Sequence, residues 1–476
     1  MRRSAATAPV LRLTLTWTLA LTLAWAAGAP APAAAVDPVA WSSPTPEQPA
    51  AVLVRGATVW TSGPEGRLEG ADLLIRAGRI AAVGPDLSAP AGAVVIDGTG
   101  KHVTPGLIDA HSHTAIDGSV NEGSDVVTAE VRIADVIDSN DIDLYRQLAG
   151  GLTAANLLHG SANAIGGQNA VIKLRWGAPP EGLLFEGATP GVKFALGENP
   201  KQSNWGGRDD PRYPQTRMGV EQAILRAFED ALAYRRAKER AAASGGRIVP
   251  PRPDLRMEAL LEILDGRRRV HSHAYRADEM LMLLGLSERY GFRIDAFQHS
   301  LEAYKIADEL AARGVSASTF SDWWAYKYEV VDAIPYNGAI LLDRGVVTSF
   351  NSDSNELARR LNTEAAKAVR YGGVAEEEAL KLVTLYPAMQ LGVADRVGSL
   401  EPGKDADFVI WNGSPLSTYS RAEETWVDGR KYFDRAADLA RREEIAAERE
   451  ALLEEAKGAG EEGEEGEEPA APEVTP

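Results

Sequence analysis

Histidines are the residues of this chain whose types and spacing could do chemistry. The segment DAHSH places His111 and His113 two positions apart, directly after an apolar run. In a β-strand, residues i and i+2 point to the same side, so both imidazoles can reach one ion. Asp353 follows another apolar run, in NSDSNE. Because imidazole and carboxylate groups are typical ligands of divalent cations, this set predicts a metal site.

Four further histidines end apolar runs elsewhere in the chain. His271 and His273 end the run RVHSH, His299 ends IDAFQH, and His159 ends another run. If these runs are parallel strands, the histidines gather with Asp353 at the carboxyl ends of the strands. Barrel enzymes carry their active sites at that face. A structural role is the alternative for any single histidine, but chance placement of the whole set is improbable.

The elements that must position these residues are apolar, strand-like runs that alternate with amphipathic helical segments. Such alternation favours a parallel sheet, and eight runs favour a (β/α)8 TIM-like barrel. The eight runs are residues 103–109, 152–158, 170–174, 192–196, 269–273, 294–299, 315–320 and 346–351.

Short β-type segments flank the predicted barrel. Residues 51–102 and residues 393–435 both have β character, so we predict one small β-sandwich domain built from both chain ends. The barrel itself is predicted over residues 103–392. It contains a long insertion at residues 199–267, which holds a polar loop followed by a long helix.

The two termini differ from the rest of the chain. Residues 1–35 have an arginine-containing start, an apolar run and a small-residue cleavage site, which is the layout of a signal peptide. We therefore predict an exported protein, periplasmic or extracellular, with a linker at residues 36–50; an uncleaved N-terminal anchor is the alternative. Residues 436–476 form an acidic tail, helical at first and then disordered.

Composition excludes several classes of protein. The chain has no cysteine, which excludes disulfides, thiolate metal sites and cysteine nucleophiles. Its net charge of −18 argues against broad nucleic-acid binding. The apolar run near the start is short for a spanning helix, so no membrane span is expected in the mature chain. A small-molecule substrate is the expected partner, and a homo-oligomer is compatible with the sequence.

Motifs along residues 51–435 resemble the amidohydrolase superfamily, specifically its imidazolonepropionase-like and dipeptidase-like branch. They occur in the order of that family, and the last resembles its closing β-domain. The motifs are PGLIDAHSH (105–113), HGSANAIGGQN (159–169), GVKFALGEN (191–199), HSHAYRADE (271–279), FQHSLEAYK (297–305), STFSDWWAYK (318–327), NSDSNE (351–356) and VGSLEPGKDADFVIW (397–411).

The resemblance implies roles for individual residues. His111 and His113 match the first-strand metal pair of the family, and His273 and His299 match the fifth-strand and sixth-strand ligands. Asp353 matches the eighth-strand aspartate, which contacts the metal and takes a proton from the attacking water.

The fourth-strand ligand is open between two residues. In this superfamily it is a carboxylated lysine, a glutamate or absent, and the segment GVKFALGEN offers both Lys193 and Glu198. Glu198 stands at the end of the predicted strand, where a ligand is expected, so we prefer it to Lys193. Either could bridge two ions, and the sequence therefore leaves one or two metals per chain.

The implied function is hydrolysis of a C–N bond of a small molecule, in an amide, a cyclic amide or a peptide. A metal-bound hydroxide would attack, and Asp353 would act as general base and then as general acid. Zinc suits this ligand set best. The alternatives are a lactonase or ester hydrolase with the same site, and a metal-binding scaffold without catalysis.

Residues that could bind the substrate are expected around this site, each with packing or capping as its alternative role. Arg208 in the insertion could pair with a substrate carboxylate, because a guanidinium offers a bidentate fork. The other candidates are His159, Gln168, Tyr275, Arg276, Tyr328 and Asn355.

Overall fold

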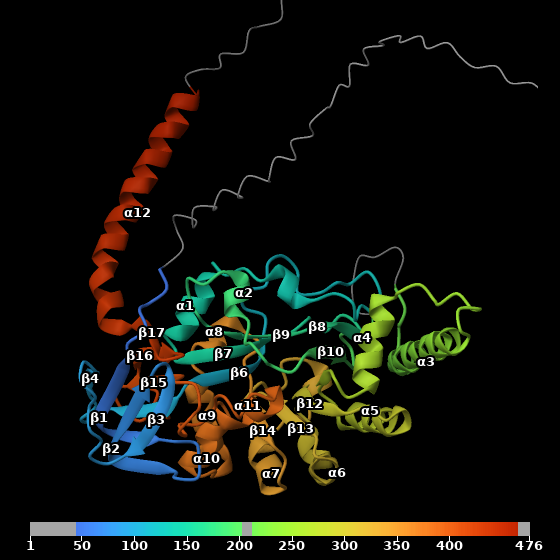
Figure 1. Cartoon of the computed structure of the whole chain (residues 1–476), viewed down its shortest axis with the longest axis horizontal. Helices are drawn as coiled ribbons and strands as arrows, with labels where there is room; N and C mark the ends of the chain where they lie inside the picture. Colours follow the sequence, from blue (N-terminus) through green and yellow to red (C-terminus); the bar gives the residue numbers. More distant parts are fainter. Residues whose placement is uncertain (1–43, 202–211, 465–476) are drawn as a thin grey trace, which may run out of the picture. The chain divides into compact units, whose positions relative to one another are not determined.

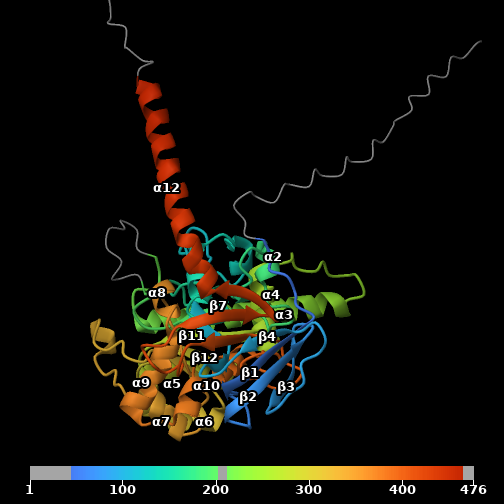
Figure 2. The same cartoon turned by 90° about the vertical axis from the view of Figure 1, so that its left-hand side faces the viewer.

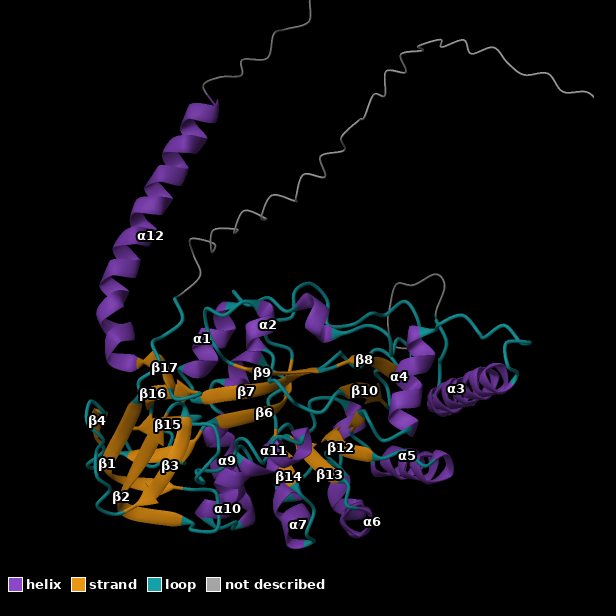
Figure 3. Ribbon diagram, in the orientation of Figure 1, coloured by secondary structure: helices purple, strands orange, loops and turns teal. Residues whose placement is uncertain are grey.

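The computed structural model describes residues 44–201 and 212–464, with side chains up to residue 458. The predicted signal peptide and Arg208 lie outside the described residues. Within the described part, the strands form three sheets, drawn in orange among the helices of Figure 3. One sheet joins the two ends of this part, and the other two carry the barrel strands.

The largest sheet confirms that both chain ends build one small β-domain. Its strand order is β17-β16-β15-β5-β1-β2-β3, with β4 paired to β1. Figures 1 and 2 show the red C-terminal strands beside the blue N-terminal strands. The strands are β1 (Ala51–Trp60), β2 (Arg67–Arg76), β3 (Arg79–Gly84), β4 (Val94–Asp97), β5 (His102–Pro105), β15 (Phe408–Trp411), β16 (Ala422–Val427) and β17 (Arg430–Asp434).

The barrel strands lie in the other two sheets, with orders β14-β13-β12-β11-β10-β8 and β6-β7-β9. The pairs from β10 to β14 are parallel, as is β6 with β7. The backbone N–H of Asp353, just after β14, donates to the carbonyl of His111 on β6 at 3.1 Å, which joins the two sheets. The strands are β6 (Leu107–Ser112), β7 (Leu152–Leu157), β8 (Ile165–Gln168), β9 (Ala170–Lys173), β10 (Gly191–Ala195), β11 (Arg269–Ala274), β12 (Ile294–His299), β13 (Ser316–Thr319) and β14 (Thr348–Phe350).

Helices alternate with the later barrel strands, as the sequence predicted. In Figure 1, α5, α6 and α7 lie beside β12, β13 and β14. The helices are α1 (Ile142–Leu148), α2 (Pro180–Leu183), α3 (Arg217–Ala243), α4 (Leu255–Leu264), α5 (Ala277–Tyr290), α6 (Ala307–Arg313), α7 (Asn337–Asp343), α8 (Asn355–Ala358), α9 (Leu361–Gly372), α10 (Glu376–Lys381), α11 (Leu385–Leu391) and α12 (Arg435–Glu464).

Two of the predicted strands differ from expectation. The run 103–109 is divided between β5 and β6 at Gly106, where a Cβ atom would lie 2.0 Å from the Thr153 hydroxyl. The run 170–174 forms β9, which pairs with β7 in the antiparallel sense. A parallel return needs a crossover connection, usually a helix, and the described chain between β7 and β9 contains no helix.

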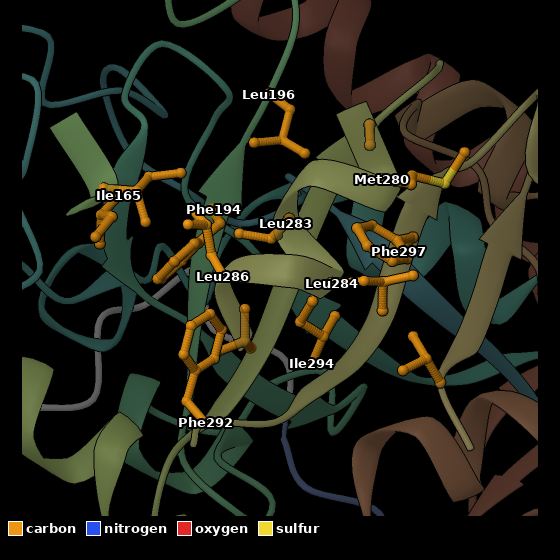
Figure 4. Packing of buried hydrophobic residues seen from close by; sticks show 14 of the residues in the cluster. Ile165, Phe194, Leu196, Met280, Leu283, Leu284, Leu286, Phe292, Ile294 and Phe297 are labelled. Carbon is orange, nitrogen blue, oxygen red and sulfur yellow. The ribbon is translucent and has the colours of Figure 1, made fainter. Parts of the chain in front are cut away.

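The insertion packs on the barrel through an apolar cluster. Thr216 caps α3 by accepting from the N–H of Gly219, and the helix then lies against α4 and α5. Phe228 of α3 contacts Phe194 of β10 and Phe292, with ring centroids 6.3 and 4.8 Å apart. Figure 4 shows the surrounding residues of this cluster. The insertion is thereby fixed beside the carboxyl end of β10.

The charged helix predicted near the C-terminus is α12, which covers residues 435–464. Tyr145 of α1 donates to Asp438 at 3.0 Å and ties the start of α12 to the barrel. None of the described helices combines the length and the apolarity that a membrane span requires.

A buried ion cluster joins the β-domain to the barrel. Lys173, at the end of β9, has no exposed side-chain surface, and its Nζ lies 2.8, 3.1 and 2.5 Å from carboxylates of Asp405, Asp407 and Asp428. Burial alone would lower the pKa of Lys173, but these carboxylates raise it. The motif GKDAD therefore supplies two of the anions that compensate a fully buried cation.

We expect Lys173→Met to lower the free energy of unfolding by about 3–5 kcal/mol, because it leaves buried carboxylates without a counter-charge. Lys101→Met is the matched control: Lys101 pairs with Glu423 at 2.8 Å, but each side chain is about one third exposed. That pair should contribute about 1 kcal/mol or less. Urea unfolding of both variants measures the difference, and equal losses would contradict the structural role of the cluster.

Candidate metal centre

Three of the predicted ligands converge on one point. The His113 Nε2 atom lies 3.1 Å and the His111 Nε2 atom 3.6 Å from Asp353 Oδ1. Their ligand atoms all fall within 4.8 Å of one another. His111 lies within β6 and His113 directly after it, so the alternation of the strand brings both rings to the same side.

The loop after β14 is held in a strained conformation that aims Asp353 at the histidines. Asp353 has a φ of +46°, a region that non-glycine residues seldom adopt. Asp109, four residues before His113, fixes this loop by accepting from the N–H and the hydroxyl of Ser352. Burial raises the pKa of Asp109 to about 6, against the effect of these hydrogen bonds.

His299 and His273 complete the cluster from β12 and β11. The His299 Nε2 atom lies 3.7 Å from Asp353 Oδ2, and the rings of His273 and His299 are 4.9 Å apart. Both ring nitrogens of His273 and the Nδ1 of His299 are buried without a hydrogen-bond partner among the described residues. Buried imidazole nitrogens rarely lack a partner, and a bound cation would supply one.

The protonation states also suit a cation. Burial holds the pKa values of His111, His273 and His299 well below their ordinary value, so these rings are neutral and offer lone pairs. Burial alone would raise the pKa of Asp353, but His113, His299 and Lys193 hold it below its ordinary value. The centre thus combines neutral imidazoles with an ionised carboxylate, a set that fits a divalent ion.

Lys193 is the fourth-strand residue that reaches this cluster. It is fully buried in β10, with its Nζ 3.3 Å from His111 Nε2 and 3.2 Å from the carbonyl of His159. Burial lowers the pKa of Lys193 to about 7, although the Asp353 carboxylate opposes this shift. Lys193 starts inside the strand, but its long side chain reaches the histidine cluster. The sequence alone favoured Glu198, at the strand end, for this position.

Glu198, the residue preferred from the sequence, lies elsewhere. Gly197 has a φ of +78° and turns the chain after β10, and the N–H of Glu198 then donates to Glu329 Oε1 at 3.0 Å. Among the described residues, the Glu198 side chain has no hydrogen bond or ion pair. Glu329 is fully buried, pairs with Lys327 at 3.2 Å and Arg217 at 3.3 Å, and so ties the insertion to the loop after β13.

Gln298 links two of the histidines and was not predicted. Its Oε1 lies 3.2 Å from His111 Nδ1, and its Nε2 lies 3.4 Å from His271 Nδ1. Neighbouring residues of a regular strand face opposite sides, which would direct Gln298 away from a site that contains His299. His299 instead has a φ of +69° at the strand end, so that both side chains enter the interior. No sequence signal marks that change.

Aromatic side chains pack against one side of the histidine cluster. The ring of Phe320 stacks on His299 with centroids 4.7 Å apart, and Trp323 stacks on Phe320 at 4.2 Å. Tyr275 is one of the predicted substrate residues, and its ring centroid lies 5.7 Å from that of His299. Its hydroxyl accepts a hydrogen bond from the Tyr326 hydroxyl at 2.7 Å. Of the predicted substrate residues that the structure describes, Tyr275 is the one shown in contact with a predicted ligand ring.

The polar groups of His159 and Gln168 are engaged by the backbone. His159 accepts from the N–H of Glu122 at 2.8 Å and donates to the carbonyl of Gly160 at 2.9 Å. Its burial lowers the pKa of the imidazole to about 4. The Gln168 amide donates to the carbonyl of Ala129 at 2.9 Å. These contacts support the alternative role, in which both residues fix loops.

The remaining described substrate candidates are either held by other partners or exposed at the surface. Arg276 pairs with Asp278 at 2.9 Å, and Tyr328 is 88% exposed on the loop after β13. Asn355 accepts from Thr114 and donates to Asp143, which fixes α8. The structure therefore shows stabilising contacts for Arg276 and Asn355, and surface exposure for Tyr328.

Comparison with known proteins agrees with this geometry. The crystal structure of an amidohydrolase from Thermotoga maritima has 35% sequence identity, a TM-score of 0.74, and an alignment covering 81% of this chain and 100% of that one. The model of the amidohydrolase family matches residues 337–445, from α7 into α12. This chain belongs to the amidohydrolase family.

Two further proteins are similar to this chain in sequence. An amidohydrolase from Hapsidospora irregularis is 32% identical over 428 residues, which cover 80% of this chain and 43% of that protein, so the chain spans less than half of that relative. An imidazolonepropionase from Deinococcus radiodurans is 26% identical over 73% of this chain and 86% of that protein. The resemblance found in the sequence motifs is therefore confirmed at the level of the family.

Proposed function

We propose that this amidohydrolase family member is an exported hydrolase that cleaves a C–N bond of a small molecule with a divalent metal ion, most simply Zn²⁺. The single observation that carries the proposal is the convergence of His111, His113 and Asp353, beside nitrogens of His273 and His299 that have no partner among the described residues. Membership of the family supports the reaction class. Export rests on the sequence of residues 1–35 alone.

The ligands of the ion would be His111, His113, His273, His299 and Asp353. When bound, a divalent ion lowers the pKa of a coordinated water toward 7 and polarises the carbonyl of the substrate. The protein must then remove the proton of that water, and Asp353 is placed to do so. Its carboxylate is ionised and lies at the centre of the histidine cluster.

Asp353 would act first as a base and then as an acid. Its carboxylate accepts the proton of the attacking water and later delivers it to the leaving nitrogen, which departs as an amine. Tyr275, Phe320 and Trp323 shield one side of this centre from water. In the same low-dielectric surroundings, the interaction between Asp353 and the developing charges is strengthened.

Lys193, rather than Glu198, is proposed as the fourth-strand residue of the centre. Its pKa of about 7 leaves a large part of the amine neutral at pH 7. A neutral amine can add carbon dioxide and lose a proton, which forms a carbamate whose oxygens could bridge two ions. The contact of Lys193 with His111 supports this assignment.

We expect Asp353→Asn to lower kcat by about 10²–10⁴-fold, because the amide cannot accept the proton. Turnover would be measured on N-acyl amino acids, dipeptides and cyclic amides, with lactones and simple esters as the competing class. Asp278→Asn is the control, since Asp278 is exposed and pairs with Arg276. Full turnover in Asp353→Asn would contradict the role of Asp353, and activity on esters or lactones alone would overturn the C–N assignment.

Metal content tests the fourth-strand residue. We expect Lys193→Met to lose metal relative to the wild type, from two ions to one if the carbamate bridges, whereas Glu198→Gln should keep the wild-type content. Elemental analysis of purified proteins measures both. The reverse pattern would restore Glu198 as the ligand, and a wild type that binds no divalent ion would overturn the proposed function.

A further inference from the structure

A cavity lined by arginines lies next to α8. Its volume is about 560 Å³, within the range of small-molecule sites. Residues of α1, α8, α9, β15, β16, β17 and the first turns of α12 line it. The charged lining residues are Arg146, Arg359, Arg360, Arg421, Arg435 and Arg442, with Glu356 and Asp438 as the acidic ones.

The charge of this cavity is opposite to that of the chain. The whole chain carries a net charge of −18, whereas the lining has six guanidinium groups and only two carboxylates. A concentration of one sign of charge in a hollow focuses the electrostatic potential and attracts ions of the opposite sign. The cavity is therefore a positive site on an acidic protein.

The arginines keep hydrogen-bond donors free for a ligand. Arg359 and Arg360 share the carboxylate of Glu356 at 2.7 and 3.4 Å. Arg421 donates to backbone carbonyls through one of its nitrogens. Arg435 has no hydrogen bond or ion pair among the described residues. Arg146 pairs with Asp143 at 3.1 Å, and Arg442 pairs with Asp438 at 3.1 Å. Since each guanidinium has five N–H donors, these contacts leave at least one donor of every lining arginine unused among the described residues.

We propose that this cavity binds a small anion with two or more phosphate or carboxylate groups. The planar fork of arginine matches either group in a bidentate fashion, and several forks in one hollow favour a multivalent ligand. None of the predicted metal ligands lines the cavity. The proposed anion site is thus separate from the metal centre and does not rest on the proposed hydrolase activity.

Calorimetric titration with pyrophosphate, and separately with citrate, at constant ionic strength tests the proposal and distinguishes phosphate from carboxylate ligands. The triple variant Arg359→Gln/Arg421→Gln/Arg435→Gln should weaken binding at least hundredfold. The control Arg235→Gln/Arg267→Gln/Arg344→Gln, which neutralises three arginines outside the cavity, should bind as the wild type does.

Three results would overturn the anion site. The first is a wild type that binds neither anion, and the second is a triple variant that binds as tightly as the wild type. The third is binding that occurs only after residues 459–476 are removed, because the acidic tail would then be the occupant of the cavity.

A second inference concerns the bridge from His271 through Gln298 to His111. All three side chains are buried, and the amide of Gln298 lies between the two rings. Its carbonyl can accept only if His111 carries its proton on Nδ1, and its NH₂ group can donate only if His271 Nδ1 is unprotonated. Once His111 carries its proton on Nδ1, rotation of the Gln298 amide would place donor against donor.

We infer that Gln298 and His271 are positioning residues that fix the tautomer of His111 and present its Nε2 lone pair to the metal ion. This inference rests on the proposed metal site. Hydrogen bonds to the second nitrogen of a metal-binding imidazole typically contribute 10–100-fold to metal affinity or activity. His271 would contribute only through Gln298, because it contacts the amide and not the predicted ligand.

Zinc affinity tests the role of the bridge from His271 through Gln298 to His111. It is measured on metal-free protein by competition with a chromophoric chelator. Gln298→Leu should weaken zinc binding about 10–100-fold, and Gln298→Glu should restore most of it, since a carboxylate still accepts from His111. His271→Leu should weaken binding in the wild type but cause no further loss in Gln298→Leu. Ser272→Ala, a buried neighbour on β11, is the control and should bind as the wild type does.

The outcomes separate this inference from the proposed function. Wild-type protein that binds no zinc overturns the metal site itself. If the wild type binds zinc, either of two results overturns only the positioning role of Gln298 and His271. One is equal zinc binding by Gln298→Leu, and the other is additive losses in the double variant Gln298→Leu/His271→Leu.

Discussion

The carboxylate of Asp353 is the group on which the arrangement of the site depends. It lies within 3.1–3.7 Å of imidazole nitrogens that come from β6, the turn after β6, and β12. These strands are far apart in the sequence, so each must end at the same height for the contacts to form. Parallel strands of a barrel provide that alignment, because their carboxyl ends share one face.

Holding an ionised carboxylate among buried imidazoles is costly, and the surrounding structure supports it. Ser352 and Asp109 fix the loop in an unfavourable backbone conformation. At the opposite end of the barrel strands from the site, the β-domain is attached through Lys173 and its three carboxylates. The charges of Asp353 and Lys173 both have specific partners, since an unpartnered charge would destabilise the fold.

The insertion and the loop after β13 bring further polar groups to the mouth of the site. The buried Glu329 joins the partly exposed Arg217 of α3 and Lys327 to the backbone of Glu198. This network fixes the backbone just after the left-handed turn at Gly197. On the same loop, Trp323 stacks on Phe320, and Tyr326 donates to Tyr275.

Much of the centre could be predicted from the sequence, because local spacing decides it. The two-residue period of a strand fixes the common side of His111 and His113, and the alternation of strands and helices indicates the barrel. The same local rule failed for Gln298, whose neighbour His299 adopts a positive φ. The choice between Lys193 and Glu198 depends on the backbone beyond the strand, where Gly197 adopts a left-handed φ of +78°.

The sequence by itself determined the family, the parallel strands and the histidines and aspartate that face one end of the barrel. The tertiary structure decided which polar side chains meet: Lys193 with His111, Gln298 between two histidines, and six arginines around one cavity. The physical reason is that these contacts join residues distant in the chain through long side chains. The two-residue period of a strand gives the face on which a side chain begins. The length of the side chain and the turns of the backbone determine where its polar end lies.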